Sequence, residues 1–197
     1  EHIFLSPLWG NFTDEGMDAI GKWHFKRMHA NQWYSILKNS LQIHIFSLCH
    51  SCPNESSAFL IKNEEAYCLY FGDTGSDEIE GEERLKNIYQ EIKPLIQEKK
   101  LKALLIEVSF PNSQDNLKLY GHLKPILLEK ELETLANVID SENPETALNG
   151  LKVMISHLKP NFQKTNNNIL IIEKEVKEIK CFGAEIILLR QSEKYTF

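Results

Sequence analysis

The order of apolar and polar residues along the chain predicts short strands that alternate with longer helices. Runs that alternate in polarity or stay apolar are typical of strands. They occur at residues 41–48, 57–61, 68–71, 102–108, 151–156 and 184–190. A hairpin turn is expected at Asn63-Glu64-Glu65. The run at 102–108 is apolar almost throughout, which predicts a strand that is buried on both faces.

Three further segments carry apolar residues three and four positions apart, the spacing of an amphipathic helix. They cover residues 82–100, 125–138 and 166–180. Pro94 is expected to kink the first helix, and Gly183 to cap the end of the third. Because strands and helices alternate, we expect an α/β fold with a layered sheet. No repeat or low-complexity linker divides residues 1–197, so we expect a single domain.

Composition narrows the class of protein. With 42% hydrophobic residues in 197, the chain is long enough for one sizeable core. A net charge of −6 argues against a nucleic-acid partner, which needs clustered lysines and arginines. The sequence has no run of about 18 apolar residues, the length that a membrane-spanning helix would need. No signal peptide precedes Glu1, so we favour a cytoplasmic location, or a periplasmic one if a leader has been removed.

The four cysteines do not form a dense disulfide framework, which makes a reducing compartment the default. Cys49-His50-Ser51-Cys52 has the spacing of a redox pair or of half a zinc knuckle. A knuckle needs a second close pair, which Cys68 and Cys181 do not supply. A thioredoxin-type pair opens a helix, whereas Pro53-Asn54-Glu55 reads as a turn. We therefore favour neither role.

Polar residues that directly follow apolar strands are the candidates for chemistry, because function in such sheets gathers at strand ends. They are His50, Asp73, Glu107 and His157, together with His122 just before a helix. Each has a structural alternative. Asp73 could instead form a turn, and His157 could be a hydrogen-bonded core histidine. Glu107 could pair with a nearby lysine, and His122 could cap the helix. Taken together, imidazoles and a carboxylate at one sheet edge suit a divalent metal such as zinc, and metal-assisted hydrolysis of a phosphate ester.

Five segments in order carry a resemblance. They are Ser56-Ser-Ala-Phe-Leu-Ile61, Phe71-Gly-Asp-Thr-Gly-Ser-Asp77, Leu105-Ile-Glu-Val-Ser-Phe-Pro-Asn112, Leu119-Tyr-Gly-His-Leu-Lys-Pro125 and Ile155-Ser-His-Leu-Lys-Pro160. This series resembles the class II cyclic-nucleotide phosphodiesterases, a branch of the metallo-β-lactamase superfamily. The resemblance runs from His50 to the C-terminus and implies a four-layer αββα sandwich.

The resemblance also implies roles for the five residues. His50 and Asp73 would hold a first metal ion, and Asp73 and His157 a second, with zinc expected for both. His122, with Glu107 behind it, would protonate the leaving 3′ oxygen. The implied reaction opens 3′,5′-cyclic AMP or cyclic GMP to the nucleoside 5′-monophosphate, with a water activated by the two metals as nucleophile.

One element of the superfamily pattern is absent. Its members carry a His-x-His-x-Asp-His run that supplies further metal ligands, and the 197 residues contain none. Two ligands for each metal fall short of the three that catalytic zinc normally has. We therefore expect a sandwich that is incomplete at the N-terminus, the C-terminal portion of a phosphodiesterase. On its own it should bind zinc weakly and hydrolyse little or nothing.

Two other readings stay open. A tRNA 3′-processing ribonuclease of the same fold would also use Glu107 and His122, although the net charge disfavours it. A non-catalytic remnant would act as a binding module, and its exposed apolar edges would favour a homodimer. Trp9, Trp23 and Trp33 are expected to pack in the core, with a substrate entrance or a dimer contact as the alternative.

Overall fold

The structure is a computed structural model that describes residues 26–36, 40–160 and 167–196. Its strands form one seven-stranded sheet in the order of the sequence. They are β1 (Trp33–Ile36), β2 (Leu41–Cys49), β3 (Glu55–Asn63), β4 (Ala66–Phe71), β5 (Leu101–Glu107), β6 (Lys152–Ser156) and β7 (Glu185–Leu188). The helices are α1 (Asp77–Glu80), α2 (Arg84–Gln97), α3 (Pro125–Ile139) and α4 (Asn168–Glu178), with single 3-10 turns η2 (Asn116–Lys118) and η3 (Pro144–Thr146). The predicted α/β class is confirmed.

Strand direction decides where the loops lie. The first four strands pair antiparallel, and β4, β5, β6 and β7 pair parallel. Because β2 and β4 are both antiparallel to β3, they point the same way, and β5 and β6 follow β4. The C-terminal ends of β2, β4, β5 and β6 therefore share one edge of the sheet.

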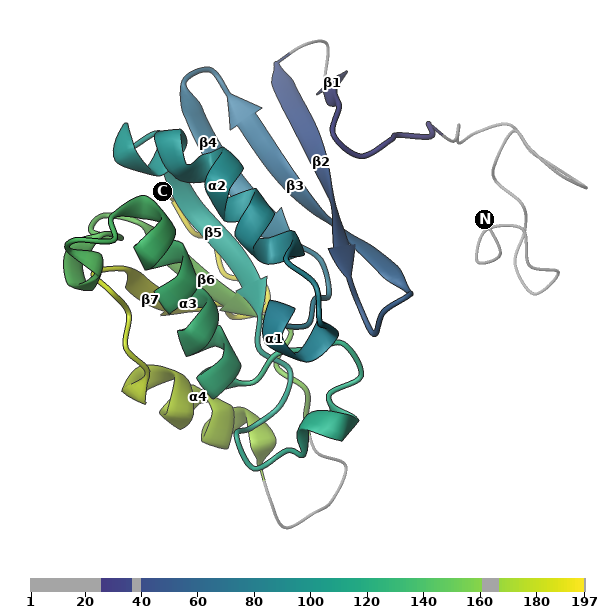
Figure 1. The fold of residues 1–197 in the computed structure, drawn as a ribbon, viewed down its shortest axis with the longest axis vertical. Helices are drawn as coiled ribbons and strands as arrows, with labels where there is room; N and C mark the ends of the chain where they lie inside the picture. Colours follow the sequence, from purple (N-terminus) through teal and green to yellow (C-terminus); the bar gives the residue numbers. More distant parts are fainter. Residues whose placement is uncertain (1–25, 37–39, 161–166, 197) are drawn as a thin grey trace, which may run out of the picture.

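The long helices α2, α3 and α4 lie over one face of this sheet (Figure 1). The buried residues of α2 recur at intervals of one to four positions, which places them on one stripe that faces the strands. In α3, Pro125 occupies the first turn, where a missing N–H costs nothing. The core between helices and sheet is aliphatic and includes Leu48, Leu69, Leu104, Ile106, Leu128 and Val153. In the described residues no helix is long and apolar enough to cross a bilayer.

Several expectations need correction. Strand β1 is an addition to the predicted strands. Its Trp33 is 48% exposed and lies tilted against the His44 ring, with the ring centroids 5.2 Å apart, instead of packing in the core. Trp9 and Trp23 lie outside the described residues. Helix α4 ends at Glu178 with an extended Ile179 as its cap, so Gly183 does not cap it. Gly183 instead adopts a φ of 92° in the turn that leads into β7, a conformation that favours glycine.

A buried carboxyl group links helices α2 and α3 to the start of helix α1. Glu131 of α3 is 4% exposed, and its Oε1 accepts a 3.0 Å hydrogen bond from the Asp77 main-chain N–H. Tyr89 of α2 donates its O–H to the other oxygen at 3.3 Å. Burial raises the pKa of the Glu131 carboxyl to about 7, and the nearby Asp77 carboxylate adds to the rise.

The raised pKa sets the sign of a pH effect. The folded chain binds the Glu131 proton more tightly than the unfolded chain does, so the free energy of unfolding should fall as pH rises from about 4.3 towards 7. Glu131→Gln removes the buried charge and should increase the unfolding free energy at pH 8 by about 1–3 kcal/mol. Urea unfolding between pH 5 and 8 measures this, with the exposed Glu133→Gln on the same helix as control. An unchanged pH profile in Glu131→Gln would contradict the assignment.

Candidate metal and phosphoester site

All five expected site residues come to the same edge of the sheet. His50 directly follows β2, Asp73 follows β4, Glu107 ends β5 and His157 follows β6. His122 lies two residues before the extended Lys124 N-cap of α3, so it is not the helix cap that the sequence left as an alternative.

Glu107 and His122 form a buried pair. Glu107 Oε1 lies 2.6 Å from His122 Nδ1, and the two side chains are 2% and 6% exposed. The same oxygen accepts the Thr74 main-chain N–H at 3.0 Å, and Ser109 Oγ donates to Oε2. Both oxygens of Glu107 are thus engaged by protein donors, and the alternative of a lysine partner is wrong. A carboxylate that accepts from Nδ1 fixes the orientation of the His122 ring.

His157 and Asp73 are the more accessible members. His157 Nδ1 lies 3.3 Å from Asp73 Oδ1, and their side chains are 41% and 47% exposed. The same nitrogen is 3.2 Å from Ser109 Oγ, which connects His157 to the Glu107–His122 pair. His157 is an exposed residue and has a φ of 58°, which is uncommon for a residue with a side chain. The alternative of a core histidine is therefore wrong.

His50 lies beside His122. The ring centroids of the two histidines are 4.7 Å apart, and His50 Nδ1 lies 2.9 Å from the Gly121 carbonyl oxygen. Donation to a carbonyl through Nδ1 leaves the lone pair on Nε2, the usual arrangement of a metal-binding histidine.

The donor set fits a divalent metal. Ligand atoms of Asp73, Glu107, His122 and His157 all lie within 4.8 Å of one another. Within this group, Glu107 is saturated by protein donors and orients His122. The members of this group with side chains accessible for coordination are Asp73 and His157, and imidazole and carboxylate are ligands that zinc prefers. His50 lies beside His122 but does not belong to the group.

Sequence reasoning assigned no role to two residues of the site. Ser109 bridges Glu107 and His157, as described above. Lys159 Nζ lies 2.7 Å from His122 Nε2 and 5.2 Å from the Phe110 ring centroid, so it brings a positive charge beside the imidazole. The only sequence signal for Lys159 was its place two residues after His157 in Ser-His-Leu-Lys-Pro.

Comparison with known proteins points to one family. The family model described as "cAMP phosphodiesterases class-II" matches residues 1–191. A Yersinia pestis protein named "Probable 3′,5′-cyclic-nucleotide phosphodiesterase" is 34% identical over 197 residues, which is all of this chain and 56% of the relative. A 3′,5′-cyclic-nucleotide phosphodiesterase of Aliivibrio fischeri is 30% identical over 199 residues, all of this chain and 59% of the relative. The chain thus spans somewhat more than half the length of these relatives.

Solved structures agree on the fold. Unliganded yeast PDE1 aligns with 96% of this chain and 54% of its own, with a TM-score of 0.79 and 25% identity. The metallo-β-lactamase fold protein YhfI of Bacillus subtilis aligns with 88% of this chain and 54% of its own, at a TM-score of 0.53 and 14% identity. The expected metallo-β-lactamase-like fold is therefore confirmed.

The close approach of Gly121 to His50 can be tested by substitution. Gly121 has a φ of 79°, and an added Cβ would lie 2.3 Å from Ser51 N and 2.7 Å from His50 Nδ1. Gly121→Ala should therefore lower the unfolding free energy by about 1–3 kcal/mol more than Gly81→Ala does. Gly81 is the matched control because its φ is 70° and no atom lies within 4 Å of the added Cβ. Equal losses in urea unfolding would show that the loops relax without cost.

Proposed function

We propose that this chain, which belongs to the class-II cAMP phosphodiesterase family, supplies one side of a site that hydrolyses 3′,5′-cyclic nucleotides to nucleoside 5′-monophosphates. The observation that carries the proposal is the meeting of Asp73 and His157 with the buried Glu107–His122 pair at one sheet edge. The relatives named as cyclic-nucleotide phosphodiesterases support the substrate class.

In this proposal His50, Asp73 and His157 would hold the divalent metal ions. Zinc suits the imidazole and carboxylate donors. When bound, the metals would activate a water and neutralise charge on the phosphate. The chain's own part is to orient the donors. Ser109 and the Asp73 carboxylate restrain the His157 ring, and the Gly121 carbonyl restrains His50.

His122 has the role of proton donor to the leaving 3′ oxygen. Its Nδ1–H donates to Glu107, so a second proton on Nε2 would create a positive charge that the carboxylate offsets. Burial of the pair strengthens this interaction, because water does not screen it. Loss of the Nε2 proton then returns the ring to its neutral form, with the Glu107 hydrogen bond intact.

Lys159 has the role of a phosphate anchor in the same proposal. Its ammonium lies beside His122 Nε2 and over the Phe110 ring. A phosphate oxygen carries charge and is therefore a stronger acceptor for the ammonium than a neutral imidazole nitrogen. Substrate would draw Lys159 away from His122, which leaves Nε2 available for the leaving oxygen.

The first experiment uses the product of the complete natural gene, with intact mass and metal content measured on one sample. Cyclic AMP, cyclic GMP and a tRNA precursor are then compared as substrates. We expect hydrolysis of a cyclic nucleotide to the 5′-monophosphate, lost by roughly 10²–10⁴-fold in His122→Ala with unchanged metal content. His157→Ala should lower the metal content, and the exposed His29→Ala serves as control.

Three outcomes would overturn the proposal. Cleavage of the tRNA precursor alone would favour a processing ribonuclease. A metal-free dimer without hydrolysis would favour a non-catalytic binding module. Full activity in His122→Ala would remove that residue from the reaction.

Lys159→Gln tests the phosphate anchor in the same protein. A hydrogen bond to a charged group contributes about 1.5–3 kcal/mol, so kcat/KM for the cyclic nucleotide should fall roughly 10–100-fold. Lys159→Arg should restore part of the loss because the positive charge remains. Lys152→Gln is the control, since Lys152 begins β6, away from the C-terminal edge, and donates to the Thr196 carbonyl. Equal kinetics for Lys159→Gln and wild type would contradict the role.

A further inference from the structure

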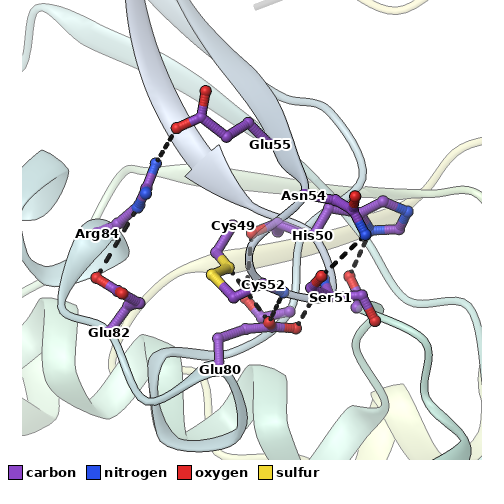
Figure 2. Close-up of a disulfide and its surroundings, with 12 residues drawn as sticks. Cys49, His50, Ser51, Cys52, Asn54, Glu55, Glu80, Glu82 and Arg84 are labelled. Atoms are coloured by element: carbon purple, nitrogen blue, oxygen red, sulfur yellow. Dashed lines mark hydrogen bonds and ion pairs between the residues drawn. A yellow bond between two sulfur atoms is a disulfide. The ribbon is translucent and has the colours of Figure 1, made fainter.

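The loop that carries His50 is closed on itself by a disulfide. Cys49, the last residue of β2, is bonded to Cys52 across His50 and Ser51, with the two Cα atoms 5.4 Å apart (Figure 2). His50 therefore sits inside a four-residue ring of main chain and side chain. The sequence interpretation, which took a reducing compartment as the default, did not predict this bond.

Glu80 holds the same ring from outside. Its carboxylate accepts the Ser51 main-chain N–H at 3.3 Å and the Cys52 main-chain N–H at 2.8 Å (Figure 2). Glu80 is the last residue of the short helix α1, in the segment that follows Asp73 along the chain. A Cβ on Gly75 would lie 2.2 Å from Glu80 Oε1, so the glycine leaves the space that this carboxylate occupies.

The remaining contacts of the ring direct His50 towards the site. The His50 main-chain N–H donates to the Asn54 carbonyl at 3.0 Å, and Ser51 has a φ of 58°. The side chain then donates from Nδ1 to the Gly121 carbonyl, next to His122. The main chain of His50 is thus restrained on one side by the end of β2 and on the other by the turn that the disulfide and Glu80 hold.

We propose that the Cys49–Cys52 disulfide and Glu80 together position His50 as a metal ligand, and that reduction of the disulfide by a small thiol weakens divalent-metal binding. This rests on the proposed function, because it takes His50 to be a ligand. The Cys49–Cys52 pair is then a thiol-sensitive modification site beside the reaction centre. Glu80 is a positioning residue and has no contact with substrate in this proposal.

Access decides how reduction proceeds. Cys52 is exposed, whereas Cys49 is 4% exposed, so an external thiolate attacks Cys52 Sγ. The S–S bond breaks, and Cys49 leaves as a thiolate that takes up a proton. A second small thiolate then attacks the outer sulfur of the mixed disulfide, and Cys52 leaves as a thiolate that takes up a proton. In sum, one protein disulfide and two thiols give one protein dithiol and one small-molecule disulfide.

The reduced cysteines could also bind the metal themselves, which would have the opposite effect on affinity. The ligand atoms of Cys49, Cys52 and Glu80 lie within 4.8 Å of one another, and thiolates are strong ligands for soft metals. If the reduced pair itself captured the metal, reduction would increase affinity instead of lowering it. The experiment therefore needs a metal whose spectrum identifies the ligand.

Cobalt(II) is that probe, titrated into the oxidised protein and into protein reduced with dithiothreitol and desalted without oxygen. We expect affinity to fall about 10–100-fold on reduction, the size of effect seen when residues that orient a metal ligand are lost. Cys49→Ser/Cys52→Ser should show the lower affinity with or without reductant. Cys68→Ser should respond to reductant as wild type does. Thermal unfolding of each variant shows whether it is folded.

Glu80→Gln provides the second line of test, because it keeps one acceptor oxygen and replaces the other by an N–H donor. We expect a smaller loss of cobalt affinity in oxidised Glu80→Gln. No loss is expected in Glu82→Gln, whose carboxylate lies 4.0 Å from Arg84 Nε (Figure 2). Unchanged affinity on reduction would overturn the proposal. A rise in affinity with a thiolate-to-cobalt absorption band would replace it by a soft-metal site.

A readout without metal separates this inference from the proposed function. The His50 Nδ1 proton, hydrogen-bonded to the Gly121 carbonyl, should give a protected NMR signal in the oxidised protein and lose that protection on reduction. If the oxidised protein binds no cobalt, the metal assignment of His50 fails while this signal still decides whether the disulfide positions the ring. Equal protection in both redox states would refute the positioning role.

Discussion

The arrangement of the candidate site depends on a single buried carboxylate at the end of the central strand β5. Glu107 is 2% exposed, and a buried carboxylate costs several kcal/mol unless donors surround it. The chain supplies those donors from three segments, through the Thr74 main chain, Ser109 and His122. Satisfying this one group therefore brings three loops to fixed positions around it.

Three glutamates connect the segment after β4 to its surroundings by hydrogen bonds. Glu107 accepts from Thr74, and Glu131 accepts from Asp77 three residues later. Glu80, at the end of the helix that this loop opens, reaches across to the turn of the cysteine pair. Acidic side chains thus act on main-chain N–H groups here, and Asp73 keeps a side chain that is half exposed for coordination.

Much of this arrangement follows from the sequence, and the rest requires the folded chain. The pattern of apolar and polar residues located α2, α3, α4 and six of the seven strands, because each of them carries a visible helical spacing or an apolar run. Strand β1 is as short as β7, with four residues each, but Ser35 interrupts its apolar residues, whereas Ile186, Ile187 and Leu188 give β7 an unbroken apolar run. The strand-end rule found His50, Asp73, Glu107 and His157, because it depends only on where apolar runs stop.

Contacts between distant segments left no such signal. Lys159 meets His122 across 37 positions, and Glu80 meets Cys52 across 28, so neither partner can be inferred from local spacing. From the sequence, the state of the cysteines could be judged only from the expected redox compartment. The folded chain places Cys49 and Cys52 on either side of one tight turn, where they form a disulfide. For Gly183 the local signal was misleading. Its position suggested a helix cap, but the glycine lies in the turn that leads into β7.

The strand pairing also places the candidate site at one end of the strands and the β3–β4 hairpin at the other. The hairpin turn at Asn63–Ala66 joins β3 to β4 at the edge opposite the site, and Glu64 and Glu65 are both exposed there. Strand β3 has nine residues, so about 30 Å of extended chain lies between that turn and the cysteine turn at its other end. The hairpin is thus a natural attachment point for a fluorophore, an affinity tag or an inserted domain, at which the chain can be extended while the chemistry at the far edge stays undisturbed.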